Sequence, residues 1–399
     1  MATFDADELL AAADAVLPAA VELRRRIHSF PEQGLDLPRT QQAVLEALEP
    51  FGFEVRTGQA LTSVVADVVG ARPGPTVLLR GDMDALPMPE DTGLDFASTV
   101  EGAMHACGHD AHTAMLAAAG MVLAQRRDTL AGRVRLMFQP GEEGYFGARF
   151  MLDEGVLEAP HVDAVFGLHV SPNIPAGMVS TRPGPIMAST NVLDITVTGM
   201  GGHASSPYLA NDPMPVAAEI VTALQTLVTR RINPFDPVVV TITTIHGGTA
   251  SNVIPESVRL QGTLRSVSES SRAKALAGIE RVVTNIAAAH EMRAEFTQTP
   301  GYPVVVNDVE FATFTQRVAA DLLGARMSFE MPAPVMGAED FGYLLQQRPG
   351  AFAFLGVCPP GENPAAAHGC HSNRMVIDEH AMRSGIAMYV AIALEYLAG

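Results

Sequence analysis

The sequence has 399 residues, of which 48% are apolar, and a formal net charge of -18 at pH 7. A chain of this length is expected to form two domains rather than one compact core. The acidic balance, without any run of basic residues, argues against nucleic acid and anionic membranes as partners, because both bind a Lys/Arg surface. These properties favour a small-molecule substrate.

The three cysteines, at positions 107, 358 and 370, are too few for a disulfide framework and are typical of a reducing compartment. The N-terminal stretch is acidic before it is basic, which is the reverse of a secretory signal. No uninterrupted apolar run reaches the roughly 18 residues of a membrane span. The sequence therefore predicts a cytoplasmic protein without a membrane segment.

The first part of the chain alternates between helices and strands. Helices are expected within residues 5–50. A further helix should begin at Asp110, as its capping residue, and end at about Gln125, and another should end at about Glu154. Apolar strands are expected over residues 76–80, 133–139 and 164–169. This alternation predicts an α/β domain with a doubly wound, mostly parallel sheet. Functional residues gather where such strands reach their carboxyl ends, and these ends carry Asp82, Asp84, Glu142, Glu143 and His169.

A proline-glycine segment at 183–185 interrupts this alternation, and a different order of elements follows. Strands are expected over 191–199, 237–246, 257–267 and 293–298, and helices over 211–230 and 268–290. The order β-α-β-β-α-β is the ferredoxin-like pattern. A second proline-glycine segment at 299–303 closes it. We therefore predict a catalytic domain formed by residues 1–184 and 300–399, interrupted by a smaller α+β domain at 185–299.

The stretch from Met104 to His112, MHACGHDAH, holds a thiol, three imidazoles and a carboxylate within nine residues. Cys107 and His109 are two residues apart, so their side chains can reach one small volume, whereas the helix after Asp110 is expected to turn His112 elsewhere. A thiolate beside an imidazole indicates a pair of metal ligands or a cysteine nucleophile with its base. The alternative is a buried free cysteine beside hydrogen-bonded histidines.

Glu142 and Glu143 follow a predicted strand directly, so that these adjacent side chains can diverge. One carboxylate could bind a metal while its neighbour acts on a nearby water; the alternative is a pair of solvated charges. His169 at a strand end and His371 in the late run HGCH add two imidazoles.

Taken in order, these motifs resemble a known family. The runs RGDMDALP, MHACGHDAHTAML, QPGEEGYFGARFML, GLHV, GMGGHASSP, SNVIP and MGAEDF, with the late histidine, are similar to the amidohydrolase branch of the dinuclear metallopeptidases. This branch includes hippurate hydrolases, N-acyl-amino-acid amidohydrolases (aminoacylases) and auxin-conjugate hydrolases. The resemblance extends from about residue 22 to the C-terminal helix. One departure is Ser372-Asn373, where members usually carry proline and an aromatic residue after the last ligand.

The resemblance implies two divalent metal ions per chain, with Cys107 bridging them and four further residues completing their coordination. Mixed sulfur, nitrogen and oxygen ligands favour Zn, with Mn, Co and Ni as alternatives. The four further ligands would be His109, Glu143, His169 and His371.

The resemblance also assigns roles beyond metal binding. Glu142 would be the general base, and Asp84 would orient a ligand, while Asp82 stands where other branches carry a ligand histidine. The inserted domain would be a lid and dimerisation domain of a homodimer, or of an oligomer of such dimers. From it, His203 would reach into the partner subunit's site, and Asn252 and Arg265 would hold the substrate carboxylate.

The expected activity is metal-dependent hydrolysis of N-acyl or N-aroyl amino acids to a free amino acid and a carboxylic acid. Two metals sharing a thiolate would lower the pKa of a bridging water from about 15.7 toward about 7. Glu142 would take up a proton as the resulting hydroxide attacks the amide carbonyl, and would then pass that proton to the leaving nitrogen. Three alternatives stay open: a dipeptidase or carboxypeptidase on the same scaffold, a non-catalytic metal-binding protein, and a cysteine hydrolase using Cys107 and His109. An unliganded Glu142 argues against the non-catalytic protein.

Overall fold

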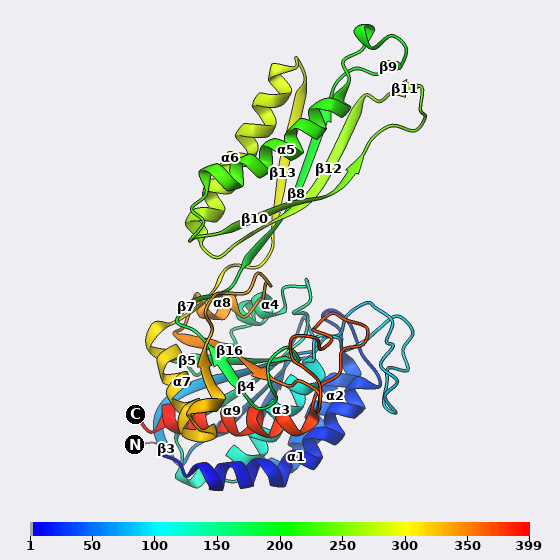
Figure 1. The fold of residues 1–399 in the computed structure, drawn as a ribbon. Coiled ribbons are helices and arrows are strands. Elements are labelled where there is room, and N and C mark those ends of the chain that lie inside the picture. The colour runs from blue at the N-terminus through cyan, green and yellow to red at the C-terminus, as the bar shows by residue number, and fades with distance from the viewer. Residues whose placement is uncertain (1–2) are drawn as a thin grey trace. The chain divides into compact units, whose positions relative to one another are not determined.

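The computed structural model describes residues 3–399; residues 1 and 2 of the predicted first segment lie outside the described residues. The chain divides into two compact units (Figure 1). The first comprises the residues up to Gly184, Val306–Ala333 and Asp340–Gly399, and the second comprises Pro185–Val305 and Pro334–Glu339. Among residues 3–399, no helix combines the length and the apolar character that a membrane crossing needs.

The second unit takes in two stretches, 300–305 and 334–339, that lie beyond the predicted boundary at residue 299. Hydrogen bonds explain the second of them. The Arg265 guanidinium donates to the Met336 carbonyl at 2.7 Å, and the Ala188 amide donates to the Gly337 carbonyl at 2.8 Å.

An eight-stranded sheet forms the centre of the first unit. Its strands are β1 (Glu54–Thr57), β2 (Val64–Val69), β3 (Arg72–Asp82), β4 (Ala131–Gln139), β5 (Ala164–Ser171), β6 (Val179–Thr181), β15 (Ser328–Glu330) and β16 (Gly350–Gly356). They lie in the order β1-β2-β4-β3-β5-β16-β6-β15. The central neighbours β4, β3, β5 and β16 are parallel, whereas β1, β2 and β4 pair antiparallel. This sheet confirms the predicted mostly parallel α/β fold.

Helices surround this sheet, and one of them carries the site. They are α1 (Ala6–His28), α2 (Pro38–Leu48), α3 (His109–Ala124), α4 (Gly147–Asp153), α7 (Val309–Leu323), α8 (Gly342–Leu345) and α9 (Met382–Leu397). Every residue of α3 is buried, and the helix packs against α1, α9 and β3 (Figure 1). Its run of small and apolar residues fits this position, because a helix without a polar face is stable only inside a core.

The second unit has the predicted β-α-β-β-α-β order. Its elements are β8 (Ser189–Thr198), α5 (Pro213–Arg231), β10 (Val238–His246), β12 (Ser257–Ser266), α6 (Glu269–Ala289) and β13 (Arg293–Pro300). The sheet order is β10-β12-β8-β13, with antiparallel neighbours throughout, which is the ferredoxin-like arrangement. Buried side chains alternate along β8, so that Leu193, Ile195 and Val197 enter a core of their own.

Four further short strands lie outside the two larger sheets. β9 (Gly202–His203) and β11 (Val253–Ile254) pair with each other in the second unit, and β7 (Gly184–Met187) and β14 (Val305–Asn307) fall at the unit boundaries.

Candidate metal centre

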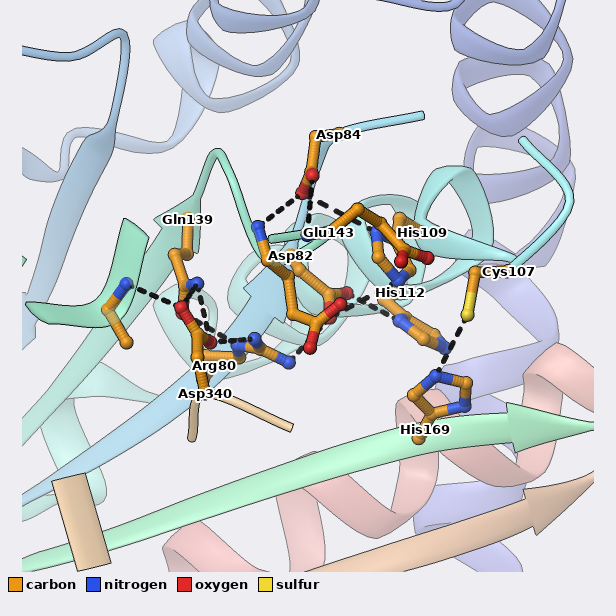
Figure 2. A network of polar contacts seen from close by, with 12 residues as sticks. Arg80, Asp82, Asp84, Cys107, His109, His112, Gln139, Glu143, His169 and Asp340 are labelled. Carbon is orange, nitrogen blue, oxygen red and sulfur yellow. Dashed lines mark hydrogen bonds and ion pairs between the residues drawn. The ribbon is translucent and has the colours of Figure 1, made fainter. Parts of the chain in front are cut away.

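The site begins at the carboxyl end of β3, where Asp82 and Asp84 are both buried. Asp84 accepts two backbone hydrogen bonds from the loop after β4: from the Glu142 amide at 2.8 Å and from the Glu143 amide at 2.9 Å (Figure 2). One carboxylate therefore fixes the backbone of both glutamates. Charge-assisted bonds of this kind are stronger than neutral ones.

His109 is the first residue of α3 and is completely buried. Its Nε2 lies 3.6 Å from Asp82 Oδ2 and its Nδ1 lies 3.6 Å from Asp84 Oδ1. Neither ring nitrogen makes a hydrogen bond to any residue among 3–399. Burial lowers the pKa of His109, but the charges of Asp82, Asp84 and Glu143 outweigh burial and raise it to about 10. This negative surrounding favours a cation beside the imidazole.

Cys107 faces His169, which projects from β5. The Cys107 sulfur lies 3.4 Å from His169 Nε2, and His169 Nδ1 donates to the Val170 carbonyl at 2.7 Å. That bond fixes the ring so that Nε2 is the nitrogen available to a metal. The candidate ligand atoms of Cys107, His109 and His169 all lie within 4.8 Å of one another (Figure 2).

A second group of candidate ligands shares the same sulfur. Ligand atoms of Cys107, Glu143 and His371 also lie within 4.8 Å of one another, and His371 Nε2 is 3.1 Å from Glu143 Oε1. His371 is held by its amide, which donates to the Ala106 carbonyl at 2.7 Å, and its backbone is left-handed with a φ of 68°. The structure therefore brings all five predicted ligands together, with Cys107 common to both groups.

Glu142 lies with these residues. It is buried, and a carboxylate oxygen of Glu142 falls within 4.8 Å of the ligand atoms of His109 and Glu143. Burial raises the pKa of Glu143, but the hydrogen bond from His371 and the charge of His109 lower it overall, so Glu143 is ionised at neutral pH.

The donor set fits divalent metal ions. Sulfur, imidazole nitrogen and carboxylate oxygen are the ligands of zinc and related ions, and the His109 nitrogens have no competing hydrogen bond among residues 3–399. Contact with the Cys370 thiol and burial raise the pKa of Cys107 well above its ordinary value. A bound cation would instead lower the pKa of Cys107, because it stabilises the thiolate.

His112 does not turn away from the site, and this expectation was wrong. The helix already begins at His109, so His112 is three residues on and lies on the same face. Its ring centroid is 4.6 Å from that of His169. Its Nδ1 donates to Asp82 Oδ1 at 2.5 Å, and its Nε2 accepts from the Val170 amide at 2.8 Å. Because both nitrogens already make hydrogen bonds, His112 is placed to support Asp82 and β5 at the site.

Asp110 does not cap α3 either. Gly108, with a φ of 83°, holds the capping position, and Asp110 lies inside the first turn. Its Oδ2 forms ion pairs with Arg24 Nε at 3.0 Å and with His28 Nδ1 at 2.8 Å, and all three side chains are buried. Asp110 therefore ties the start of α3 to α1.

Arg80 was not predicted to be part of the site, yet its side chain connects Asp82 to Gln139 and Asp340. Its buried guanidinium donates to Asp82 at 2.5 Å, to Gln139 Oε1 at 3.0 Å and to Asp340 Oδ1 at 3.0 Å (Figure 2). Burial raises the pKa of Asp82, but the charges of Arg80, His109 and His112 lower it well below the ordinary value. An arginine within the otherwise apolar strand TVLLR was the available signal in the sequence.

The three remaining predicted residues, His203, Asn252 and Arg265, belong to the second unit. His203 and Asn252 are exposed neighbours: β9 and β11 pair His203 with Val253, and the Ala204 amide donates to the Asn252 carbonyl at 3.0 Å. Arg265 is partly buried on β12 and donates to the Met336 carbonyl.

Comparison with known proteins defines the class of this chain. Residues 78–395 match the family described as Peptidase family M20/M25/M40. The chain belongs to this family and is a hydrolase.

Individual relatives cover nearly the whole chain. Thermostable carboxypeptidase 1 of Saccharolobus solfataricus is 38% identical over 94% of this chain and 95% of its own. IAA-amino acid hydrolase ILR1-like 2 of Arabidopsis thaliana is 39% identical over 94% of this chain and 85% of its own. The structure of the Bacillus subtilis YXEP protein, titled a dinuclear metal binding peptidase, superposes with a TM-score of 0.83 at 33% identity, covering 96% of this chain and 99% of that one.

Gly108, between the candidate ligands Cys107 and His109, offers a test of local packing. Gly108→Ala should lower the free energy of unfolding by about 2–4 kcal/mol, because the left-handed φ is strained for alanine and the new Cβ would lie 2.4 Å from Val170 Cγ2. Gly102→Ala is the matched control, since its φ is 72° but no atom lies within 4 Å of the added Cβ. It should lose only about 1 kcal/mol. Urea unfolding of both variants measures the difference, and equal losses would show that the contact with Val170 does not matter.

Proposed function

We propose that this hydrolase cleaves the amide bond of N-acyl or N-aroyl amino acids and releases the free amino acid and a carboxylic acid. The observation that carries the proposal is the placement of Glu142, a buried carboxylate beside the candidate ligands His109 and Glu143. A similarity of 39% to an IAA-amino acid hydrolase supports an amide conjugate of an amino acid as the substrate class.

The proposed cofactor is a pair of divalent ions, which His109, Glu143, His169 and His371 would hold together with Cys107, the residue common to both groups of candidate ligands. Zn suits this donor set best, with Mn, Co and Ni as alternatives. When bound, such ions polarise a carbonyl oxygen and lower the pKa of water. A reducing cytoplasm, the proposed location, would keep Cys107 available as a ligand.

Glu142 is the proposed general base. Its backbone is fixed by Asp84, so its carboxylate is held at the site while the adjacent Glu143 side chain turns to His371. Glu142 removes a proton from the attacking water and returns it to the amide nitrogen as that nitrogen leaves. Asp84 contributes by positioning both glutamates and by its charge beside His109.

His203 is the proposed donor to the oxyanion that develops on the substrate carbonyl. Its Nδ1 accepts a hydrogen bond from the Ser205 amide at 3.1 Å, which places the proton of the neutral ring on Nε2. The exposed Nε2 is then free to donate. In the proposed homodimer, His203 serves the partner subunit's site, and Asn252 and Arg265 bind the substrate carboxylate.

A carboxypeptidase is the second candidate, because thermostable carboxypeptidase 1 is 38% identical over most of the chain. The two activities differ at the acyl side of the scissile bond. A free dipeptide carries an α-ammonium group there, which needs an anionic partner, whereas an N-acyl group does not.

A substrate panel separates the two candidates. At one enzyme concentration, N-acetyl and N-benzoyl amino acids should be hydrolysed with kcat/KM at least about 10-fold above that of the matching free dipeptides, because an unpaired ammonium group is costly to desolvate. Release of free amino acid is the measurement. Faster hydrolysis of the dipeptides would favour the carboxypeptidase.

The two glutamates form a matched pair of variants. Glu142→Gln should keep its metal and its fold while kcat falls by at least about 100-fold, as expected for loss of a general base. Glu143→Gln removes a ligand charge, so its metal content should fall. Metal analysis and initial rates of both proteins test this assignment. Loss of metal from Glu142→Gln alone would mean that the two roles are reversed.

The role of His203 is tested by mixing variants. His203→Ala should lower kcat by about 100-fold while metal content and oligomeric state stay unchanged, as expected for loss of one oxyanion donor. Subunit exchange with Glu142→Gln chains should then restore activity, because one site of each mixed dimer has Glu142 from one chain and His203 from the other. Mixtures shown to contain the heterodimer but lacking recovered activity would contradict action across the dimer.

A further inference from the structure

Cys370 is a second thiol at the metal centre that the proposed mechanism does not use. It lies in the loop before α9, immediately before His371, and is partly exposed. Its sulfur is 3.9 Å from the carbonyl oxygen of Cys107 and 3.7 Å from that of Val170. It belongs to neither group of candidate ligands centred on Cys107.

The backbone brings the two loops that carry the cysteines together. The His371 amide donates to the Ala106 carbonyl at 2.7 Å, so the residues next to both cysteines are already in contact. A disulfide requires Cα atoms within about 7 Å and Cβ atoms that face each other. Gly108 and Gly369 adjoin the two cysteines, and glycine accepts backbone conformations that other residues rarely adopt.

We propose that Cys107 and Cys370 form a reversible disulfide when a peroxide oxidises the site, and that this bond releases the metal ions. The inference rests on the proposed function in one respect, which is that Cys107 is a metal ligand. Formation of the disulfide itself does not depend on that assignment.

The chemistry proceeds in two displacements. The sulfur of Cys370, the less buried of the two residues, attacks hydrogen peroxide: a sulfur–oxygen bond forms, the oxygen–oxygen bond breaks, and the leaving hydroxide takes up the thiol proton as water. The Cys107 sulfur, a thiolate when it binds metal, then attacks the Cys370 sulfenic acid: the disulfide forms, the sulfur–oxygen bond breaks, and the leaving hydroxide takes up a proton from the solvent to give a second water. The two cysteines together lose two electrons, and one peroxide becomes two waters.

The metal ions are lost because a disulfide sulfur is neutral. The thiolate is the form of cysteine that binds metal, so oxidation removes the one ligand that both candidate groups share. Because His371 directly follows Cys370, a movement of Cys370 toward Cys107 would also displace the His371 side chain, another candidate ligand. A thiol reductant and fresh metal should reverse both changes.

The experiment adds hydrogen peroxide to the metal-loaded full-length enzyme and follows two readouts. Released metal is measured with a chromogenic chelator, and disulfide-linked peptides are mapped by mass spectrometry. The wild type should lose its metal in step with a Cys107–Cys370 linked peptide, and reduction with dithiothreitol should remove the link and allow metal to rebind.

Two single variants serve as test and control. Cys370→Ser should form no linked peptide and release metal at least about 10-fold more slowly, because Cys107 alone is buried. Cys358→Ser should behave as the wild type, since the Cys358 sulfur contacts the carbonyls of Pro359 and Glu362 instead. Absence of the linked peptide in the wild type, or equally fast metal release from Cys370→Ser, would overturn the proposal. An untreated enzyme without metal would instead contradict the proposed function, whatever the peptide map shows.

Discussion

The candidate site depends on two buried carboxylates, Asp82 and Asp84, placed where β3 ends. Side chains two residues apart on an extended chain point to the same side, so both face the first turn of α3. Asp84 holds the amides of Glu142 and Glu143, and Asp82 holds His112 and Arg80. A buried charge without such partners would destabilise the fold by several kcal/mol. The same bonds that make these charges tolerable also bring the loop after β4 to the start of α3.

His109 lies in the strongly negative place between Asp82 and Asp84. Arg80 and His112 each form a direct hydrogen bond to Asp82, whereas His109 approaches both aspartates only to 3.6 Å. Divalent ions beside His109 and Cys107 would balance these charges and stabilise the thiolate. Folding, ligand geometry and metal affinity are therefore expected to be linked, because ligands held before binding lose little freedom when the metal arrives.

Much of this site could be predicted from the sequence because its residues follow local patterns. The strand ends identified Asp82, Asp84, Glu142 and His169, and the density of the MHACGHDAH run identified Cys107 and His109. The β-α-β-β-α-β order was also predicted from local patterns along the chain, and the sheet order confirms the ferredoxin-like arrangement.

What could not be predicted depends on contacts between distant segments. Asp340 is 260 residues from Arg80, and Cys370 is 263 residues from Cys107, so no spacing rule links them. His112 was placed wrongly for a different reason. Its position follows from the first residue of α3, and a shift of one or two residues in a helix start turns a side chain to another face.

The central claim is that Cys107 bridges two divalent ions, and metal K-edge X-ray absorption of the purified enzyme, combined with elemental analysis, tests it most directly. We predict about two ions per chain, sulfur in the coordination shell of the metal, and a metal–metal vector of roughly 3.5–4 Å, as in other two-metal sites. All sulfur scattering should disappear in Cys107→Ser, whose metal content should also fall. A single ion per chain without a sulfur ligand would contradict the account.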